Sequence, residues 1–137
     1  MNLMLNPIRI ESIYDELDTN AINFILDNGY FSIQAGVYLE EDEQLNEPIF
    51  EFNDQGDSQN GGVEKIVFGD RQILLVFQDN DLFLKKYKTV ELMLSQKVDR
   101  KIVDFFANCL FLGNMLAYEN GFDESSKVIQ TKRREGL

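Results

Sequence analysis

The chain has 137 residues, 24 acidic and 13 basic side chains, and a formal net charge of −11. This length fits one domain whose core is large enough to fold without a covalent or metal staple. The single cysteine excludes an internal disulfide, and the absence of histidine removes the usual general base and most zinc sites. We therefore expect no metal, no cofactor and no enzymatic activity.

The charge is unevenly distributed along the chain. Residues 1–62 contain 13 acids and one base, Arg9, whereas residues 63–137 contain 11 acids and 12 bases. This acidity disfavours nucleic acid and anionic membranes as partners, and it favours a basic protein through electrostatic steering. A charge that only keeps the protein soluble is the alternative interpretation.

Two further features bear on the compartment. Met1–Leu5 lacks the basic start and the cleavage site of a secretory signal, and no apolar run approaches the ~20 residues of a membrane span. We therefore expect a cytoplasmic protein, and a lone cysteine fits a reducing compartment. Cys109 lies among apolar residues of a predicted helix, where we expect it to be part of the core and not reactive.

The first half of the chain reads as short strands. They are expected at Ile8–Ile13, Ala21–Leu26, Tyr30–Leu39 and Ile49–Phe52. Tyr14–Asn20 is polar and is predicted as a connection, and Asp27-Asn28-Gly29 is a strong turn signal. Asn53–Gly62 is predicted as a loop, and it lacks the twelve-residue spacing of a calcium-binding loop.

The densest strand signal is a hairpin. Val63–Phe68 and Ile73–Phe77 flank Gly69-Asp70, and glycine followed by a small polar residue suits a two-residue type II′ turn. That turn would place Ile66 opposite Ile73. Because Ile73–Phe77 is apolar on both faces, it is predicted to be a central strand that is covered on both sides.

The segments around the hairpin complete the predicted sheet. Gly61-Gly62 predicts a bulge or a tight entry into the first strand. Asp81–Lys86 is predicted to form one helical turn. Thr89–Leu94 is predicted as the last strand.

A helix follows the last strand. Apolar residues recur at helical spacing from Ile102 to Leu112, which predicts a helix packed on one sheet face. Ser95 would cap a helix that begins near Gln96, and Asp99 is the alternative cap.

The predicted fold class is α+β. It has a mainly antiparallel sheet of about five or six strands with a central hairpin, packed against one main C-terminal helix. We expect a single domain over residues 1–118 and a polar, flexible tail over residues 119–137.

The Gly61-Gly62-Val63 step and the hairpin after it resemble the immunity protein 10 family of bacterial polymorphic toxin systems. Members tend to carry this step, a hairpin, a helical or loop segment, a further strand and a helix. The corresponding parts here would be Gly61–Val63, Glu64–Phe77, Gln78–Lys86, Thr89–Leu94 and Lys101–Leu112. Phe31–Gln34 would match the glutamine-bearing strand that lies upstream in such proteins. The resemblance covers residues 30–112.

This resemblance implies a non-enzymatic immunity protein that binds and neutralises a cognate bacterial toxin. The acidic composition of this chain further predicts a basic toxin, because an acidic inhibitor can occupy a basic active site through fast, electrostatically steered association. The candidate partner-binding residues are chosen because they are acidic, and not because they match a motif of the family. They are Glu40, Glu41, Asp42, Glu43, Glu47, Glu51, Asp54 and Asp57. A solvated acidic turn is the alternative interpretation of residues 40–43.

Two other classes of protein fit the same composition. A secretion chaperone is also small, acidic and cytoplasmic, although Met1–Asn20 does not offer the leading amphipathic helix of that class. An adaptor that binds a protein partner without catalysis is the other class. The sequence leaves the oligomeric state and the identity of the toxin open.

Overall fold

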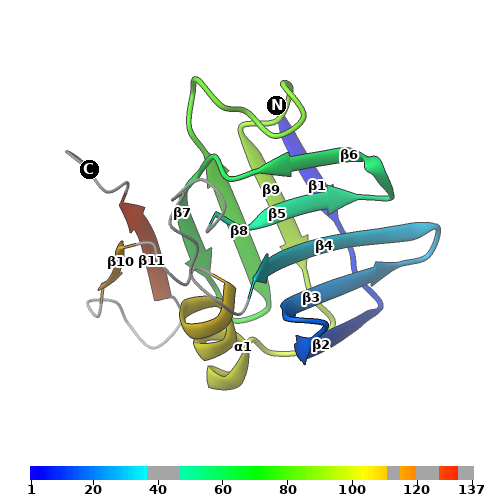
Figure 1. The fold of residues 1–137 in the computed structure, drawn as a ribbon, viewed down its shortest axis with the longest axis vertical. Coiled ribbons are helices and arrows are strands. Elements are labelled where there is room, and N and C mark those ends of the chain that lie inside the picture. The colour runs from blue at the N-terminus through cyan, green and yellow to red at the C-terminus, as the bar shows by residue number, and fades with distance from the viewer. Residues whose placement is uncertain (37–46, 111–114, 120–126, 133–137) are drawn as a thin grey trace.

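The computed structural model describes residues 1–36, 47–110, 115–119 and 127–132. It is mainly β, with two sheets and one short helix (Figure 1). Sheet A contains, in spatial order, β1 (Asn2–Leu5), β9 (Thr89–Met93), β8 (Gln72–Phe77), β7 (Val63–Phe68), β11 (Lys127–Lys132) and β10 (Met115–Glu119). Sheet B contains β2 (Arg9–Glu16), β3 (Thr19–Leu26), β4 (Gly29–Gly36), β5 (Ile49–Phe52) and β6 (Asp54–Asn60).

The strands of the two sheets run in antiparallel pairs, except that β1 lies parallel to β9. The strands of sheet B run across those of sheet A (Figure 1), and one hydrophobic core contains residues of both. The prediction of mainly antiparallel strands is confirmed, but the prediction of a single sheet is wrong. Each sheet buries the apolar side chains of one face in this core, and the two faces exclude most water by packing against each other.

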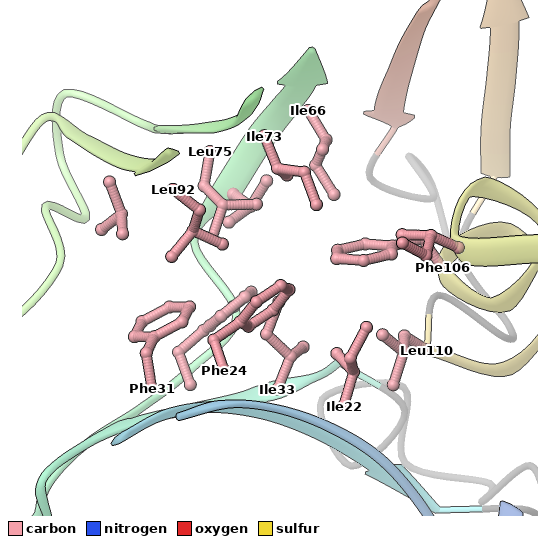
Figure 2. Packing of buried hydrophobic residues seen from close by; sticks show 14 of the residues in the cluster. Ile22, Phe24, Phe31, Ile33, Ile66, Ile73, Leu75, Leu92, Phe106 and Leu110 are labelled. Carbon is pink, nitrogen blue, oxygen red and sulfur yellow. The ribbon is translucent and has the colours of Figure 1, made fainter. Parts of the chain in front are cut away.

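The core lies between the sheets. Figure 2 shows Phe24 and Phe31 of sheet B facing Leu75 and Leu92 of sheet A, and all four side chains are fully buried. Phe83 joins them from the connection between β8 and β9, and it is also fully buried. The core therefore draws on both sheets and on an irregular segment.

The helical region closes one end of the sandwich. Helix α1 (Arg100–Phe105) continues into a π-helical turn, η2 (Phe106–Leu110). Phe106 points between the sheets, and its ring centroid lies 5.2 Å from that of Phe68 (Figure 2). A helix after the predicted strand Thr89–Leu94 is confirmed, but it is short, and it packs at the end of the sandwich and not flat on one sheet face. The fold is therefore mainly β, which corrects the predicted α+β class with one main C-terminal helix.

The start of the helix follows the alternative prediction. The carboxylate of Asp99 accepts a hydrogen bond from the backbone N–H of Ile102 at 3.0 Å, so Asp99 is the N-cap. The prediction that Ser95 caps a helix beginning near Gln96 is wrong. The predicted end of the helix, at residues 111–112, lies outside the described residues.

The hairpin is central but its register differs from the prediction. Phe68 pairs with Ile73 and Ile66 pairs with Leu75, so the turn is two residues longer than predicted. Gly69 lacks the positive φ that a type II′ turn requires, and its N–H donates to the carbonyl of Gln72 at 2.8 Å. A shift of two residues keeps Ile66 and Phe68 on the same face as Ile73 and Leu75, because the strand period is two.

Strand β8 lies between β7 and β9, so its predicted central position is confirmed. Ile73, Leu75 and Phe77 are fully buried on its inner face. Leu74 and Val76, on the other face, are only half-buried. The prediction that this strand is covered on both sides is therefore wrong for its outer face.

Two segments predicted as connections are strands. Asn53–Gly62 contains β6, which pairs with β5. Tyr14–Asn20 contributes the end of β2 and the start of β3, which meet at a two-residue turn. Both turn residues, Leu17 and Asp18, have positive φ (53° and 60°), as a type I′ hairpin turn requires. Hydrogen bonding between backbones, and not side-chain alternation, places these polar residues in strands.

Two other predictions can be compared with the structure. Asp81–Lys86 is not a helical turn, because Leu84 and Lys85 have φ of 52° and 62°. Gly61-Gly62 does precede a register shift in β7, as predicted. The edge strand β1 has no counterpart in the sequence prediction. Part of the predicted third strand, Val37–Leu39, lies outside the described residues.

The C-terminal residues extend sheet A. Within the predicted tail, Lys127–Lys132 forms β11 and pairs with β7. Residues 120–126 and 133–137 of that tail lie outside the described residues. Among the residues that are described, no helix is long and apolar enough to cross a membrane.

Candidate functional site

The outer face of sheet B, which points away from the core, is built entirely by residues of the acidic half of the chain. Strand register aligns its side chains in rows across the sheet. One row is Glu11, Asn23, Ser32, Glu51 and Ser58. The next row is Ile13, Ala21, Gln34, Ile49 and Asn60. A third, shorter row is Arg9, Ile25 and Tyr30.

The centre of this outer face is polar but uncharged. Ser32 is 1% exposed, and its hydroxyl accepts a hydrogen bond from the side-chain amide of Gln34 at 3.1 Å. Ile49, beside Gln34, is 42% exposed. Strand β4 lies between β3 and β5, so these side chains are held on a preorganised surface.

Tyr30 and Glu51 form the clearest polar contact on the outer face. The Tyr30 hydroxyl donates a hydrogen bond to Glu51 Oε2 at 2.6 Å, and the Tyr30 N–H donates to Asn53 Oδ1 at 2.8 Å. The hydrogen bond to Glu51, followed by burial and the charges of Glu51 and Asp54, raises the pKa of Tyr30 to about 12. Glu51 thus stabilises the neutral phenol.

We expect one of the five tyrosines to titrate with a pKa of about 12, and Glu51→Gln to return it toward 10.0. Because the folded pKa is raised, the stability from this contact is complete below pH 10.0 and is lost as pH rises toward about 12. The NMR shift of Tyr30 Cζ against pH measures this, and Glu64→Gln on sheet A is the control. A Tyr30 that titrates at its ordinary pKa would contradict the contact.

The structure brings together only some of the predicted partner-binding residues. Glu51 lies within the outer face, and Glu47 lines a hollow of about 120 Å³ with Gln34 and Ile49 of that face. Asp54 is exposed beside the irregular β5–β6 pairing, where its carboxylate accepts the N–H of Gly56 at 3.0 Å. The other predicted residues are Glu40, Glu41, Asp42 and Glu43, which lie outside the described residues, and Asp57.

Asp57, on the edge strand β6, lines an open groove. The groove has a volume of about 690 Å³ and runs between β6 and the loop 79–85. Gln59 joins its two walls: its amide donates to the Asp81 carbonyl at 3.2 Å and accepts the Leu84 N–H at 2.9 Å. Asp57 thus lines this groove, whereas Glu47 and Glu51 do not.

Another acid of the groove, Asp79, is already paired with a lysine. Asp79 pairs with Lys88 at 2.9 Å, and the pKa of Lys88 is raised, chiefly by this hydrogen bond.

Within the described residues, no three histidine, cysteine, aspartate or glutamate side chains are placed to hold a metal ion. Cys109 is half-buried, and burial raises the pKa of its thiol.

Sequence reasoning missed several residues that share sheet B with Glu51. These are the acids Glu11, Asp15 and Glu16 of its strands, Asp18 and Asp27 of its turns, and the uncharged residues Tyr30, Gln34 and Ile49. The acids were visible in the charge count of residues 1–62. The missing information was that all these segments belong to one sheet.

Comparisons of this chain with protein-family models, with curated proteins and with solved structures find no match. The resemblance around Gly61-Gly62-Val63 therefore stays a prediction.

Proposed function

We propose that this protein is an immunity protein that binds and neutralises a basic toxin domain through sheet B. One observation carries the proposal: the acidic residues of the first half of the chain give sheet B a net negative charge, whereas the strands of sheet A are balanced in charge. The strands of sheet B contain six acids and one base, whereas the strands of sheet A contain three acids and three bases. The acids of sheet B are Glu11, Asp15, Glu16, Glu51, Asp54 and Asp57.

The arrangement of these acids supports a role in binding. Three of them lie along β2, and three lie on β5 and β6 at the other edge of the sheet. Strands β3 and β4, between them, contain no charged residue. Protein interfaces commonly have a charge-poor centre and a polar rim. Charge at the rim chiefly accelerates association with an oppositely charged partner.

The partner can be found by using the wild-type protein as bait in a lysate of its native host, at low and then moderate salt. The proposal expects one stoichiometric basic protein that carries a toxin domain and is released as salt rises. That protein can then be purified, and its activity measured with and without the wild-type chain. A purified partner whose activity is unchanged by a stoichiometric amount of this protein would contradict an immunity role.

We expect charge reversal on sheet B to slow association with that partner by about tenfold or more at low salt. The variant combines Glu11→Lys, Glu16→Lys and Asp57→Lys, which are exposed side chains. The salt dependence of the association rate should also become weaker, because fewer charges steer the encounter. Stopped-flow or surface-binding kinetics measure both quantities.

A matched control separates the location of charge from its amount. Glu64→Lys, Asp70→Lys and Asp104→Lys lie outside sheet B. Three reversals add six charges, so both variants change the net charge from −11 to −5. The proposal expects a smaller effect for the control. Equal slowing by both variants would mean that net charge alone, and not sheet B, attracts the partner.

A further inference from the structure

The turn between β2 and β3 exposes two large apolar side chains among acids. Leu17 is 94% exposed and Tyr14 is 73% exposed. Asp15, Glu16 and Asp18 surround them in the chain and are exposed as well. We call residues 14–18 the acidic tip.

The backbone of the acidic tip is held in a conformation that Leu17 disfavours. Leu17 has φ of 53° and Asp15 has φ of 51°. Asparagine and glycine occupy this left-handed region readily, whereas leucine is disfavoured there. Leu17 therefore combines a strained backbone with an apolar side chain in solvent, and neither feature stabilises the isolated protein.

A buried polar residue holds the acidic tip in place. Asn20 is 3% exposed, and its side-chain oxygen accepts the backbone N–H of Asp15 at 2.7 Å. Its side-chain nitrogen donates to the carbonyl of Cys109 in η2 at 3.4 Å. The tip is thereby connected to the helical end of the sandwich, so its shape is set before any partner binds.

We propose that the acidic tip is an anchor: Leu17 enters an apolar pocket on the basic partner, and Asp15 and Asp18 contact lysines or arginines at the pocket rim. Apolar side chains that fill a pocket dominate many interfaces, while the surrounding charges exclude water and set orientation. Local strain is typical of functional sites. This inference rests on the proposed function, because it assumes the same basic partner.

The first test is Leu17→Asn, measured with the purified partner captured by the wild-type bait. Asparagine tolerates the left-handed backbone, so the melting temperature should stay the same or rise by about 2–4 °C. Affinity should fall by about tenfold or more, mainly through faster dissociation. Met4→Asn, at a 55% exposed apolar residue on sheet A, is the control and should leave affinity unchanged.

The second test replaces Leu17 with the photocrosslinking amino acid benzoylphenylalanine, again with the purified partner. The expected crosslink joins it to a peptide of that partner with apolar residues flanked by lysine or arginine. Asp27, at the turn between β3 and β4, is the control position.

The outcomes separate the two proposals. Unchanged affinity of Leu17→Asn, with normal wild-type binding, overturns the anchor and leaves the proposed function standing. Failure of the wild-type chain to bind any basic partner overturns both.

Discussion

Replacing Phe83 with alanine is expected to lower the free energy of unfolding by about 3–5 kcal/mol. Phe83 is fully buried, and its ring centroid lies 5.7 Å from that of Phe31 and 5.3 Å from that of Phe77. These neighbours belong to sheet B and sheet A respectively. Removing the ring would leave a cavity between the sheets that neither sheet can fill without moving. Urea unfolding followed by circular dichroism measures the loss.

The adjacent Leu82 provides the control, because it lies in the same connection but is half-buried. We expect Leu82→Ala to cost about 1 kcal/mol or less. If Phe83→Ala costs no more than Leu82→Ala, the connection between β8 and β9 does not contribute to the core.

Gly62→Ala is expected to destabilise the protein by about 1–3 kcal/mol. Gly62 has φ of +96°, a conformation that side chains disfavour. An added Cβ would lie 2.8 Å from Asp81 Oδ2 and 2.8 Å from Gln59 Nε2. The substitution would therefore disturb the hydrogen bonds that join β6 to the loop 79–85. Thermal and urea unfolding measure the effect.

Gly69→Ala is the matched control for Gly62→Ala. Gly69 has no left-handed φ, and an added Cβ would lie 3.5 Å from Gln72 Cβ, an ordinary contact. Its effect should stay within about 0.5 kcal/mol, with a small gain possible because alanine restricts the unfolded chain. A large loss for Gly69→Ala together with none for Gly62→Ala would contradict the observed backbone at both glycines.

Local features of the fold were predictable where a side-chain pattern encodes them. A mainly apolar run closed by the turn signal Asp27-Asn28-Gly29 identified Ala21–Leu26 as a strand, and two apolar runs identified the central hairpin. Gly61-Gly62 was recognisable because positive φ favours glycine. The hairpin register was not predictable, because Gly69-Asp70 fits a short turn and the observed longer turn equally well on side-chain periodicity.

Less of the candidate site was predictable. Composition drew attention to Glu47 and Glu51, which the structure places at the outer face of sheet B. It also grouped Asp57 with them, although Asp57 lines the groove beside the loop 79–85 and they do not. Neighbours in the chain can point to opposite sides of a strand, so proximity in sequence does not define a surface.

The sequence by itself determined which side chains avoid water and where negative charge accumulates. Those properties belong to residue type and spacing, so they are present before the chain folds. Only the tertiary structure decided that there are two sheets, that the polar segment Asp54–Asn60 is an edge strand, and that Phe83 completes the core. Each of these depends on pairing or packing between distant segments, and backbone hydrogen bonds between strands leave no signature in the side chains.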